Sequence, residues 1–407
     1  MKTVDFFFDY SCPYAYLAST QIEAICQRTG ATLVWKPMLL GGVFRELGAA
    51  QNQASVMSPQ KAQHNLADMH RWASLWSVPL SMPEAHPMRT VEALRATLAS
   101  PKDKLSRVIH SLYRAYWVDH QNLTERAVIV AALTRAGVDG EAVVASIDQH
   151  TKDQLKANTD EALARGVFGA PSVLVGDQMF WGQDRLWMVE AALGGNPTQP
   201  GAGLYPKPSA PLSVDFYFDF SSPFAYLAST QIEAVCTRHQ ALLHWRPMLL
   251  GGVFKALGGP MVPIETFSPP KQRYQGVELE RWASHWKVPF AWPTRFPMRT
   301  VKALRIALSL GDQMLPYVYR VFRAYWAEDL DIDDEGVLRR LLQESGFDPA
   351  QVSAAEDPAY KKALFEATQR SVDAGVFGVP TSIVGGHLFW GQDRLFLVER
   401  VLEGWRP

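Results

Sequence analysis

The sequence predicts an α/β protein made of two copies of one domain, and three observations carry this prediction. Residues 4–48 align without gaps on residues 214–258, and 32 of the 45 positions are identical. Shared strings continue to the end of each copy, with one residue lost in the second, such as Gly-Val-Phe-Gly at 166–169 and 375–378. Within each copy, short apolar runs typical of strands flank long stretches with helical spacing. Two copies of domain size indicate duplicated domains rather than a solenoid.

A stretch rich in glycine and proline separates the two copies. Residues 194–211 have no hydrophobic periodicity and are typical of a semi-extended linker. We therefore expect one domain at 1–193 and the second at 212–407. Each is long enough to bury its own core.

The first half of each copy has a β-α-β pattern, described here for the first copy. Val4–Asp9 is a short apolar run with β-prone residues and predicts a buried strand. Pro13 suits the first turn of the helix that follows, and Gly30 closes that helix. Residues 32–35 predict a second strand, which Pro37 stops.

The second half of each copy has long helical patterns followed by two strands and a helix. Helical spacing dominates from about residue 58 to 165, as in 61–75. Two short strands are expected at 173–175 and 179–181, and an amphipathic helix at 184–193. This order is that of two tandem thioredoxin-like domains, each with an inserted helical subdomain.

The charge balance excludes several classes of protein. The chain has 40 Lys and Arg against 41 Asp and Glu, which argues against general binding of nucleic acid or an acidic membrane. No apolar run approaches the roughly 18 residues of a membrane span. Asp5 and Asp9 interrupt the apolar start, so no secretory signal is expected. Three cysteines are too few for a disulfide scaffold, and the ten histidines show no metal-binding spacing. We expect a cytoplasmic protein without a metal.

The turn between the first strand and the first helix differs between the copies. Cys12 and Ser222 occupy the same place, directly before the helix. Backbone N–H groups and the helix dipole stabilise an anion there, so the pKa of Cys12 is expected to be lowered. A serine hydroxyl at this place can donate a hydrogen bond to the thiolate of a ligand. The alternative is an ordinary helix N-cap.

Neither turn is a Cys-x-x-Cys motif. Cys26 lies 14 residues after Cys12 on the same helix, which is roughly 21 Å at about 1.5 Å per residue. Bridged Cα atoms lie within about 6.8 Å, so the two cannot pair. Cys26 and Cys236 are expected to be buried structural thiols. A dithiol exchange cycle within the chain is therefore excluded.

Four motifs carry a resemblance to a known family. They are Phe-Asp-Phe-Ser-Ser-Pro-Phe-Ala-Tyr-Leu (218–227), Pro-Met-Leu-Leu-Gly-Gly-Val-Phe (37–44 and 247–254), Gly-Val-Phe-Gly-Val-Pro-Thr (375–381) and Phe-Trp-Gly-Gln-Asp-Arg (180–185 and 389–394). Both copies resemble the DsbA-like group that comprises 2-hydroxychromene-2-carboxylate isomerases and kappa-class glutathione transferases. The resemblance covers nearly all of each copy.

The resemblance implies glutathione as the cofactor. It places the active-site serine at Ser222, whereas Cys12 is a departure. It also implies cis prolines, preceded by a residue whose backbone pairs with the cysteinyl part of glutathione. A Gln-Asp pair would hold the γ-glutamyl end, with a helix N-cap as the alternative role of the Asp. These residues are Ala170, Pro171, Gln183 and Asp184 in the first copy, and Val379, Pro380, Gln392 and Asp393 in the second.

The family also has an Asn and a Lys nine residues apart, and the Lys would face the glycyl carboxylate. The first copy has Asn52 and Lys61. The second copy keeps Lys271 but has Val262 in place of the Asn. Solvated helix lysines are the alternative. Each copy thus departs once from the family pattern, so we expect the copies to be inequivalent.

The function implied by the resemblance is glutathione-dependent isomerisation of an aromatic hydroxy-acid. The thiolate would add to an electrophilic carbon of the substrate, a bond would rotate or a ring would open, and the thiolate would leave. A pocket for the substrate is expected, with a core role of the aromatic residues as the alternative. Its candidate residues are Arg89, Tyr116, Trp117, Arg299, Tyr325 and Trp326.

Three alternatives remain open. They are a kappa-like glutathione transferase, a monothiol oxidoreductase that uses Cys12, and a non-enzymatic ligand-binding protein with degenerate sites. Since the family forms homodimers of single copies, the two copies are expected to pack as an intrachain pseudo-dimer.

Overall fold

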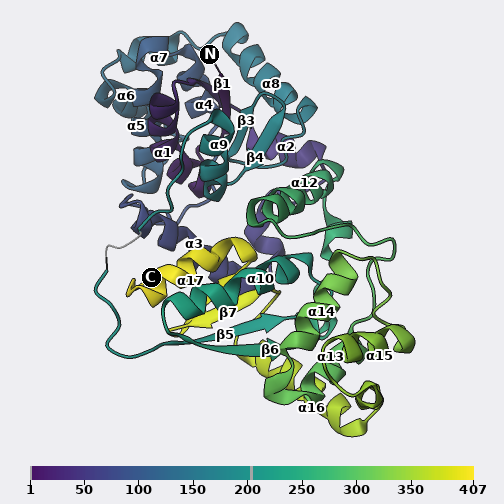
Figure 1. The fold of residues 1–407 in the computed structure, drawn as a ribbon. Coiled ribbons are helices and arrows are strands. Elements are labelled where there is room, and N and C mark those ends of the chain that lie inside the picture. Colours follow the sequence, from purple (N-terminus) through teal and green to yellow (C-terminus); the bar gives the residue numbers. More distant parts are fainter. Residues whose placement is uncertain (1, 202–204) are drawn as a thin grey trace. The chain divides into compact units, whose positions relative to one another are not determined.

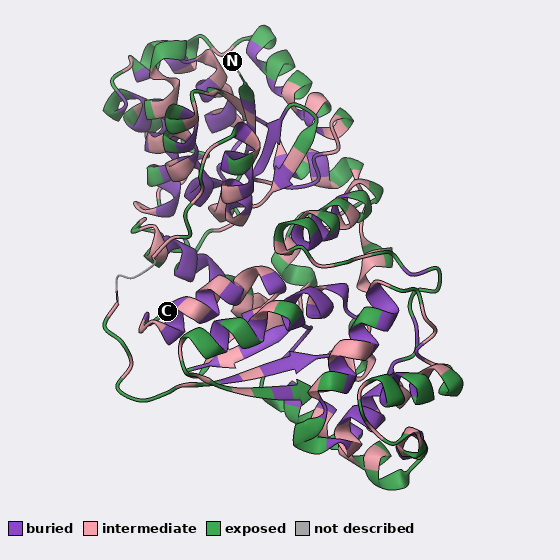
Figure 2. Cartoon of the chain, in the orientation of Figure 1, coloured by how far each residue is buried: buried purple, intermediate pink, exposed green. Residues whose placement is uncertain are grey.

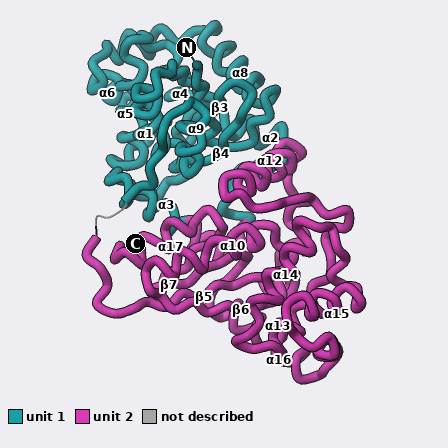
Figure 3. The backbone as a smooth tube through the Cα atoms, in the orientation of Figure 1, with its two compact units in different colours: residues 1–56, 66–201 teal, residues 57–65, 202–407 magenta. Residues whose placement is uncertain are grey.

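The computed structural model describes residues 2–201 and 205–407, so linker residues 202–204 lie outside the described residues. The described chain forms two compact units (Figure 3). The first holds residues 2–56 and 66–201, and the second holds residues 57–65 and 205–407. The sequence predicts one domain at 1–193, whereas nine residues of that range belong to the second unit.

A four-stranded sheet forms the centre of the first unit. Its strands are β1 (Thr3–Phe8), β2 (Thr32–Pro37), β3 (Ser172–Val175) and β4 (Gln178–Trp181), in the order β2-β1-β3-β4. β1 is parallel to β2 and antiparallel to β3. The consecutive side chains of Phe6, Phe7 and Phe8 are all fully buried. Because successive residues of a strand point to opposite faces, both faces of the sheet are covered.

Helices cover this sheet and fill the segment between β2 and β3. α1 contacts α9 and α5, and α8 contacts β2, α2 and α4. Gly30 ends α1 in the left-handed conformation (φ 66°), as the sequence predicts. The helices are α1 (Pro13–Thr29), α2 (Leu40–Glu46), α3 (Pro59–Leu75), α4 (Val91–Ala99), α5 (Leu105–Trp117), α6 (Arg126–Arg135), α7 (Gly140–Ala145), α8 (Gln149–Ala164) and α9 (Leu186–Leu193).

The second unit repeats this arrangement (Figure 1). Its sheet has the order β6-β5-β7-β8, and the central strands β5 and β7 are mostly buried, whereas the edge strand β6 has exposed residues (Figure 2). Its strands are β5 (Ser213–Phe218), β6 (Leu242–Pro247), β7 (Thr381–Val384) and β8 (His387–Trp390). Its helices are α10 (Pro223–Arg238), α11 (Leu250–Ala256), α12 (Pro269–Trp286), α13 (Val301–Ser309), α14 (Leu315–Trp326), α15 (Glu335–Glu344), α16 (Pro358–Asp373) and α17 (Leu395–Leu402).

The predicted order of elements is confirmed in both units. The last helix of the first unit begins at Leu186, two residues later than predicted, because a 3-10 turn (Gln183–Arg185) precedes it. Among the described residues, no helix has the length and apolar character needed to cross a membrane.

Candidate active site

Ser222 lies at the N-terminus of α10 and makes two hydrogen bonds. Its Oγ accepts from the backbone N–H of Ala225 at 3.2 Å and donates to the carbonyl oxygen of Val379 at 3.0 Å. The first bond is a helix N-cap, so the capping interpretation is correct for this residue. The second bond joins the hydroxyl to the loop before Pro380. Ser222 is buried, so a ligand sulfur would meet this hydroxyl away from bulk water.

Cys12 takes the same place in the first unit with different chemistry. Its Sγ lies 3.1 Å from the carbonyl oxygen of Ala170, and the side chain makes no capping hydrogen bond. Burial raises the pKa of Cys12 to about 12, although the N–H groups of Ala15 and Tyr14 act in the opposite direction. The predicted lowering of this pKa is therefore wrong. Loss of hydration destabilises the thiolate more than the helix N-terminus stabilises it.

The residues that precede β3 and β7 form the loops that meet these two side chains. The Ala170–Pro171 and Val379–Pro380 bonds are both cis, as the resemblance implies. In the second unit, a Cβ on Gly378 would lie 2.7 Å from the indole nitrogen of Trp390. The rings of Phe377 and Trp390 pack with centroids 5.1 Å apart. The Gly-Val-Phe-Gly and Phe-Trp-Gly-Gln-Asp-Arg motifs are therefore in direct contact, and the second glycine is needed for the close approach.

Each Gln-Asp pair follows β4 or β8 after a single glycine. Gly391 holds the helix N-cap position with φ 109°, so Asp393 is not the N-cap. Asp393 instead pairs with Arg394 at 3.1 Å, and both side chains are largely buried. Asp184 makes the same pair with Arg185 at 3.0 Å. The sequence analysis missed both arginines, although each belongs to a repeated motif.

Gln183 carries an unused hydrogen-bond donor. It is 3% exposed, and its buried Nε2 atom has no hydrogen-bond partner among the described residues. A buried amide without a partner costs free energy, which a ligand with an acceptor group would recover. The predicted γ-glutamyl position in the first unit therefore fits a ligand that carries a carboxylate.

The predicted Asn–Lys pair of the first copy is divided between the two units. Asn52 belongs to the first unit, where it is exposed and its Oδ1 accepts from the N–H of Ala54 at 3.0 Å. Lys61 belongs to the second unit. Asn52 and Lys61 therefore lie in different units, and their shared role in one site of the first copy stays a prediction.

The second unit brings Lys61 and Lys271 into electrostatic contact. Burial lowers the pKa of Lys271 to about 8, and the charge of Lys61 adds to this shift. Burial also lowers the pKa of Lys61. The Lys61 ammonium lies 5.2 Å from the ring centroid of Trp390, and the backbone N–H of Trp390 donates to His64 Nε2 at 3.2 Å. Two cations removed from water favour an anionic ligand.

A buried aspartate that the sequence analysis did not assign positions each turn. Asp9 Oδ1 accepts from the backbone N–H and the hydroxyl of Ser11, both at 3.0 Å, and from Thr90 Oγ1 at 2.6 Å. Its Oδ2 accepts from the N–H of Leu40 at 3.0 Å. Asp9 therefore ties together the turn, the start of α2 and the start of α4.

Asp219 plays the same part in the second unit. It accepts from the N–H groups of Ser221 at 3.0 Å and Leu250 at 2.7 Å. Burial raises the pKa of Asp219, while these bonds and one from Thr300 act to lower it. A signal existed in the sequence, because an Asp follows the first strand and a Pro-Met-Arg-Thr string recurs in both copies.

The predicted substrate pocket is not formed by its aromatic candidates. Tyr116, Trp117, Tyr325 and Trp326 are fully buried in the core, as the alternative interpretation holds. Their polar atoms are used internally: Tyr116 Oη accepts from the N–H of Met88 at 2.9 Å, and the indole N–H groups of Trp117 and Trp326 donate to the carbonyl oxygens of Tyr10 and Phe220. Arg89 and Arg299, in contrast, are exposed.

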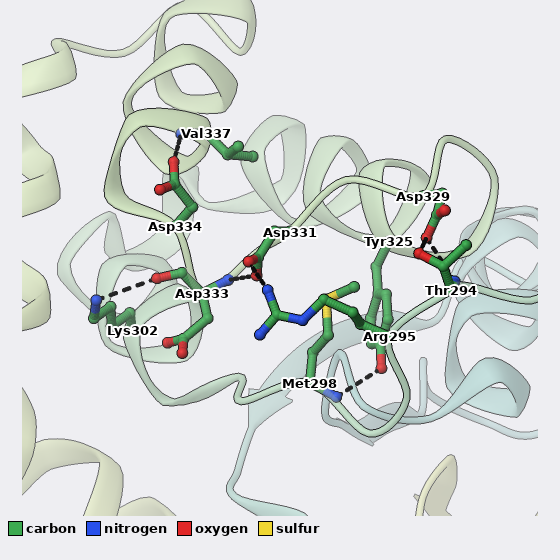
Figure 4. A network of polar contacts seen from close by, with 10 residues as sticks. All are labelled: Thr294, Arg295, Met298, Lys302, Tyr325, Asp329, Asp331, Asp333, Asp334 and Val337. Atoms are coloured by element: carbon green, nitrogen blue, oxygen red, sulfur yellow. Dashed lines mark hydrogen bonds and ion pairs between the residues drawn. The ribbon is translucent and has the colours of Figure 1, made fainter.

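Tyr325 is part of a polar network that holds the loop before α13 (Figure 4). Its hydroxyl accepts from the N–H of Met298 at 3.0 Å. Arg295 forms an ion pair with Asp331, and the N–H of Thr294 donates to Asp329 at 2.8 Å. The loop that carries Arg299 is therefore fixed to the segment after α14.

Comparison with known proteins identifies the domains. The family model of the DSBA-like thioredoxin domain matches residues 3–194 and again residues 213–403. The chain belongs to the DSBA-like thioredoxin domain family. It contains two DSBA-like domains, one in each repeat.

Relatives of these DSBA-like domains include named enzymes. A 2-hydroxychromene-2-carboxylate isomerase from Sphingobium xenophagum is 31% identical over 47% of this chain and 97% of the relative. A glutathione S-transferase kappa 1 from Caenorhabditis elegans is 27% identical over 48% of this chain and 92% of the relative. A solved structure of a 2-hydroxychromene-2-carboxylate isomerase is 25% identical, covers 47% of this chain and 94% of its own, and has a TM-score of 0.43. Each of the two curated enzymes thus matches about half of this chain.

Proposed function

We propose that the protein is a glutathione-dependent isomerase that acts on an aromatic hydroxy-acid through the site at Ser222. The observation that carries this proposal is the geometry of the Ser222 hydroxyl. It lies at a helix N-terminus, donates to the carbonyl before Pro380, and is buried. The similarity of about half of the chain to 2-hydroxychromene-2-carboxylate isomerases supports the reaction type.

The residues around Ser222 fit glutathione by charge. Lys61 and Lys271 supply two partly buried cations in the second unit for carboxylate groups. Asp393, in its ion pair with Arg394, offers a carboxylate for the γ-glutamyl ammonium. Val379 offers its backbone for strand-like pairing. When bound, glutathione would supply a thiolate nucleophile that adds to the substrate and leaves again.

The chain's own residues would keep that nucleophile ionised. The Ser222 hydroxyl can turn its hydrogen from the Val379 carbonyl to a sulfur placed at the N-terminus of α10. The N–H groups of the first helical turn and the helix dipole favour negative charge at the same point. Asp219 fixes the turn and thereby the direction of the hydroxyl.

A kappa-like transferase is the second candidate function, because a relative of that name matches about half of this chain. The same thiolate site would serve both reactions. The oxidoreductase alternative is weaker, since the pKa of Cys12 is raised to about 12 and all three cysteines are buried and free.

The first experiment is a calorimetric titration of the whole chain with reduced glutathione. We expect one or two sites per chain, with loss of one site in Ser222→Ala and a smaller effect in Cys12→Ala. Turnover is then measured with 2-hydroxychromene-2-carboxylate, and with an electrophilic aryl halide to detect transferase activity. Absence of binding at millimolar glutathione, or full activity of Ser222→Ala, would contradict the proposal.

Lys271 provides a second test that does not depend on turnover. With its pKa near 8, this lysine is partly neutral at pH 8, and a nearby carboxylate would raise the pKa. Glutathione binding at pH 8 should therefore take up more protons in the wild type than in Lys271→Gln, and the difference should vanish at pH 6. Calorimetry in two buffers of different ionisation enthalpy measures this. Equal proton uptake by both proteins at pH 8 would exclude Lys271 from the site.

We further propose that the two repeats act as an intrachain pseudo-dimer. The protein should then have the mass of a single chain, 45.5 kDa, in sedimentation experiments. A mass of two chains or more would argue against it.

A further inference from the structure

A pocket of about 400 Å³ lies in the second unit, apart from the candidate active site. It is bounded by the edge strand β6 with Tyr217 of β5, by the junction of α13 and α14, and by α16. It shares no residue with Ser222, the Pro380 loop or the Gln-Asp pair. Thr300, directly before α13, bonds to Asp219 near Ser222, whereas the pocket reaches Gly311 beyond the other end of α13. A helix of nine residues spans about 13 Å, so the pocket is a separate site.

The first repeat serves as an internal reference for the charges of this pocket. At the matching positions, Lys36 Nζ and Glu161 Oε2 form an ion pair at 2.8 Å. The second repeat has Arg246 and Arg370 there. Arg246 pairs with Asp215 at 2.7 Å, and Arg370 Nη1 lies 3.9 Å from Glu366. Where the first repeat has a Lys–Glu ion pair, the second repeat therefore has two guanidinium groups that line a pocket.

Three residues that line this pocket are smaller than their counterparts in the first repeat. Asn158, whose Nδ2 donates to the carbonyl oxygen of Pro37 at 3.0 Å, corresponds to Ala367. Thr97 corresponds to Ala307, and Lys102 to Gly311. A Cβ at Gly311 would meet no atom within 4 Å. The substitutions therefore open space along one side of the sheet.

Other differences add hydrogen-bonding groups to the same wall. Phe7 and Ala162 of the first repeat correspond to Tyr217 and Ser371. Trp245 also lines the pocket. The wall thus combines aromatic side chains with two hydroxyls and two guanidinium groups.

These features select a ligand by its chemistry. The ring of Tyr217 and the apolar side chains of Leu308 and Met314 suit an aromatic ring, and guanidinium groups bind carboxylates in a bidentate manner. Asp312 also lies at the rim and repels a second negative charge. The volume is within the range of small-molecule sites and suits an acid of one or two rings.

We propose that this pocket binds a small aromatic monocarboxylate at a site additional to the one at Ser222. The proposal does not depend on the proposed function, because none of its residues takes part in the glutathione site. We assign the site to the second repeat, since the first has Glu161 at the position of Arg370 and an acidic side chain there repels a carboxylate.

The test is a titration of the whole chain with 2-naphthoate, in the presence of saturating reduced glutathione and in its absence. We expect one saturable site per chain in both conditions. Arg370→Glu restores the residue type of the first repeat and should weaken binding roughly tenfold or more, because a charge-assisted pair is lost. Ala367→Asn should weaken binding by filling the pocket. The neutral 2-naphthamide should bind more weakly than 2-naphthoate to the wild type.

Two controls distinguish a loss of this pocket from a general effect of charge reversal or of unfolding. Arg340→Glu makes the same charge change on α15, where Arg340 lies 3.6 Å from Glu344, and should leave binding unchanged. Thermal unfolding of each variant verifies that it is folded. Absence of saturable binding at millimolar 2-naphthoate, or equal affinity of the wild type and both pocket variants, would overturn the proposal. Binding that Ser222→Ala abolishes would also overturn it, because it would place the ligand at the glutathione site.

Discussion

In the first repeat the atom before the turn proline is the sulfur of Cys12, and in the second it is the oxygen of Ser222. Both lie about one hydrogen-bond length from the carbonyl before a cis proline, at 3.1 and 3.0 Å. Only the serine also accepts a hydrogen bond from the first turn of the helix. The turn therefore has the same geometry with a sulfur as with an oxygen at this position, because the hydrogen bonds that hold the turn come from Asp9 and Asp219.

The largest expected effect concerns the aspartates that supply those contacts. Asp219→Ala removes the acceptor for the N–H groups of Ser221 and Leu250 and should lower the free energy of unfolding by about 3 kcal/mol. Asp9→Ala should have a similar effect in the first repeat. Chemical denaturation followed by circular dichroism measures both. Asp215→Ala, four residues earlier on β5 and partly exposed, is the control, and a loss for Asp219→Ala no larger than this control would refute the shared role.

The next effect concerns the contact between the two loop motifs. Gly378→Ala places a methyl group 2.7 Å from the indole nitrogen of Trp390 and should cost about 2 kcal/mol while weakening glutathione binding. Gly259→Ala is the matched control, because its Cβ would approach the nearest atom, the carbonyl oxygen of Phe254, only to 3.7 Å. Thermal unfolding and calorimetry give the two readouts. Unchanged glutathione affinity in a folded Gly378→Ala protein would separate this contact from the ligand site.

A smaller effect is expected from exchanging the two turn residues. Cys12→Ser should gain a capping hydrogen bond to Ala15 and stabilise the first repeat by about 1 kcal/mol. Ser222→Cys should lose the bond to Ala225 and destabilise the second repeat by a similar amount. Calorimetric unfolding of both variants tests this symmetry. A lower unfolding temperature for Cys12→Ser would show that sulfur packing outweighs the cap.

The smallest effect lies at the other end of the same helices. Gly30 ends α1 with φ 66°, whereas Gln240 follows α10 with φ 55°. Because a left-handed conformation strains a residue with a Cβ, Gln240→Gly should stabilise the second repeat by about 0.5 kcal/mol. Gly30→Gln should destabilise the first repeat. Equal unfolding midpoints for Gln240→Gly and the wild type would show that the strain is relieved elsewhere.

The fold could be predicted from the sequence because the duplication is visible when the two copies are aligned and because hydrophobic spacing is a local signal. The strand around Phe6–Phe8 and the helix end at Gly30 follow from patterns of a few residues, whereas the cis bond at Pro171 was implied only by the family resemblance. The raised pKa of Cys12 was not predictable, since the desolvation that causes it depends on residues distant in the chain. The position of Lys61 was missed for the same reason.

The position of the segment 57–65 determines what happens when the two repeats are separated. This segment is encoded in the first repeat but belongs to the second compact unit, where His64 accepts from the backbone of Trp390. Because both repeats are part of one chain, every second repeat is made together with the segment 57–65 that completes its unit. If the linker were cut, the same union would become a bimolecular step, and its yield would fall on dilution. The fusion of the two repeats therefore makes the assembly of the second unit independent of protein concentration.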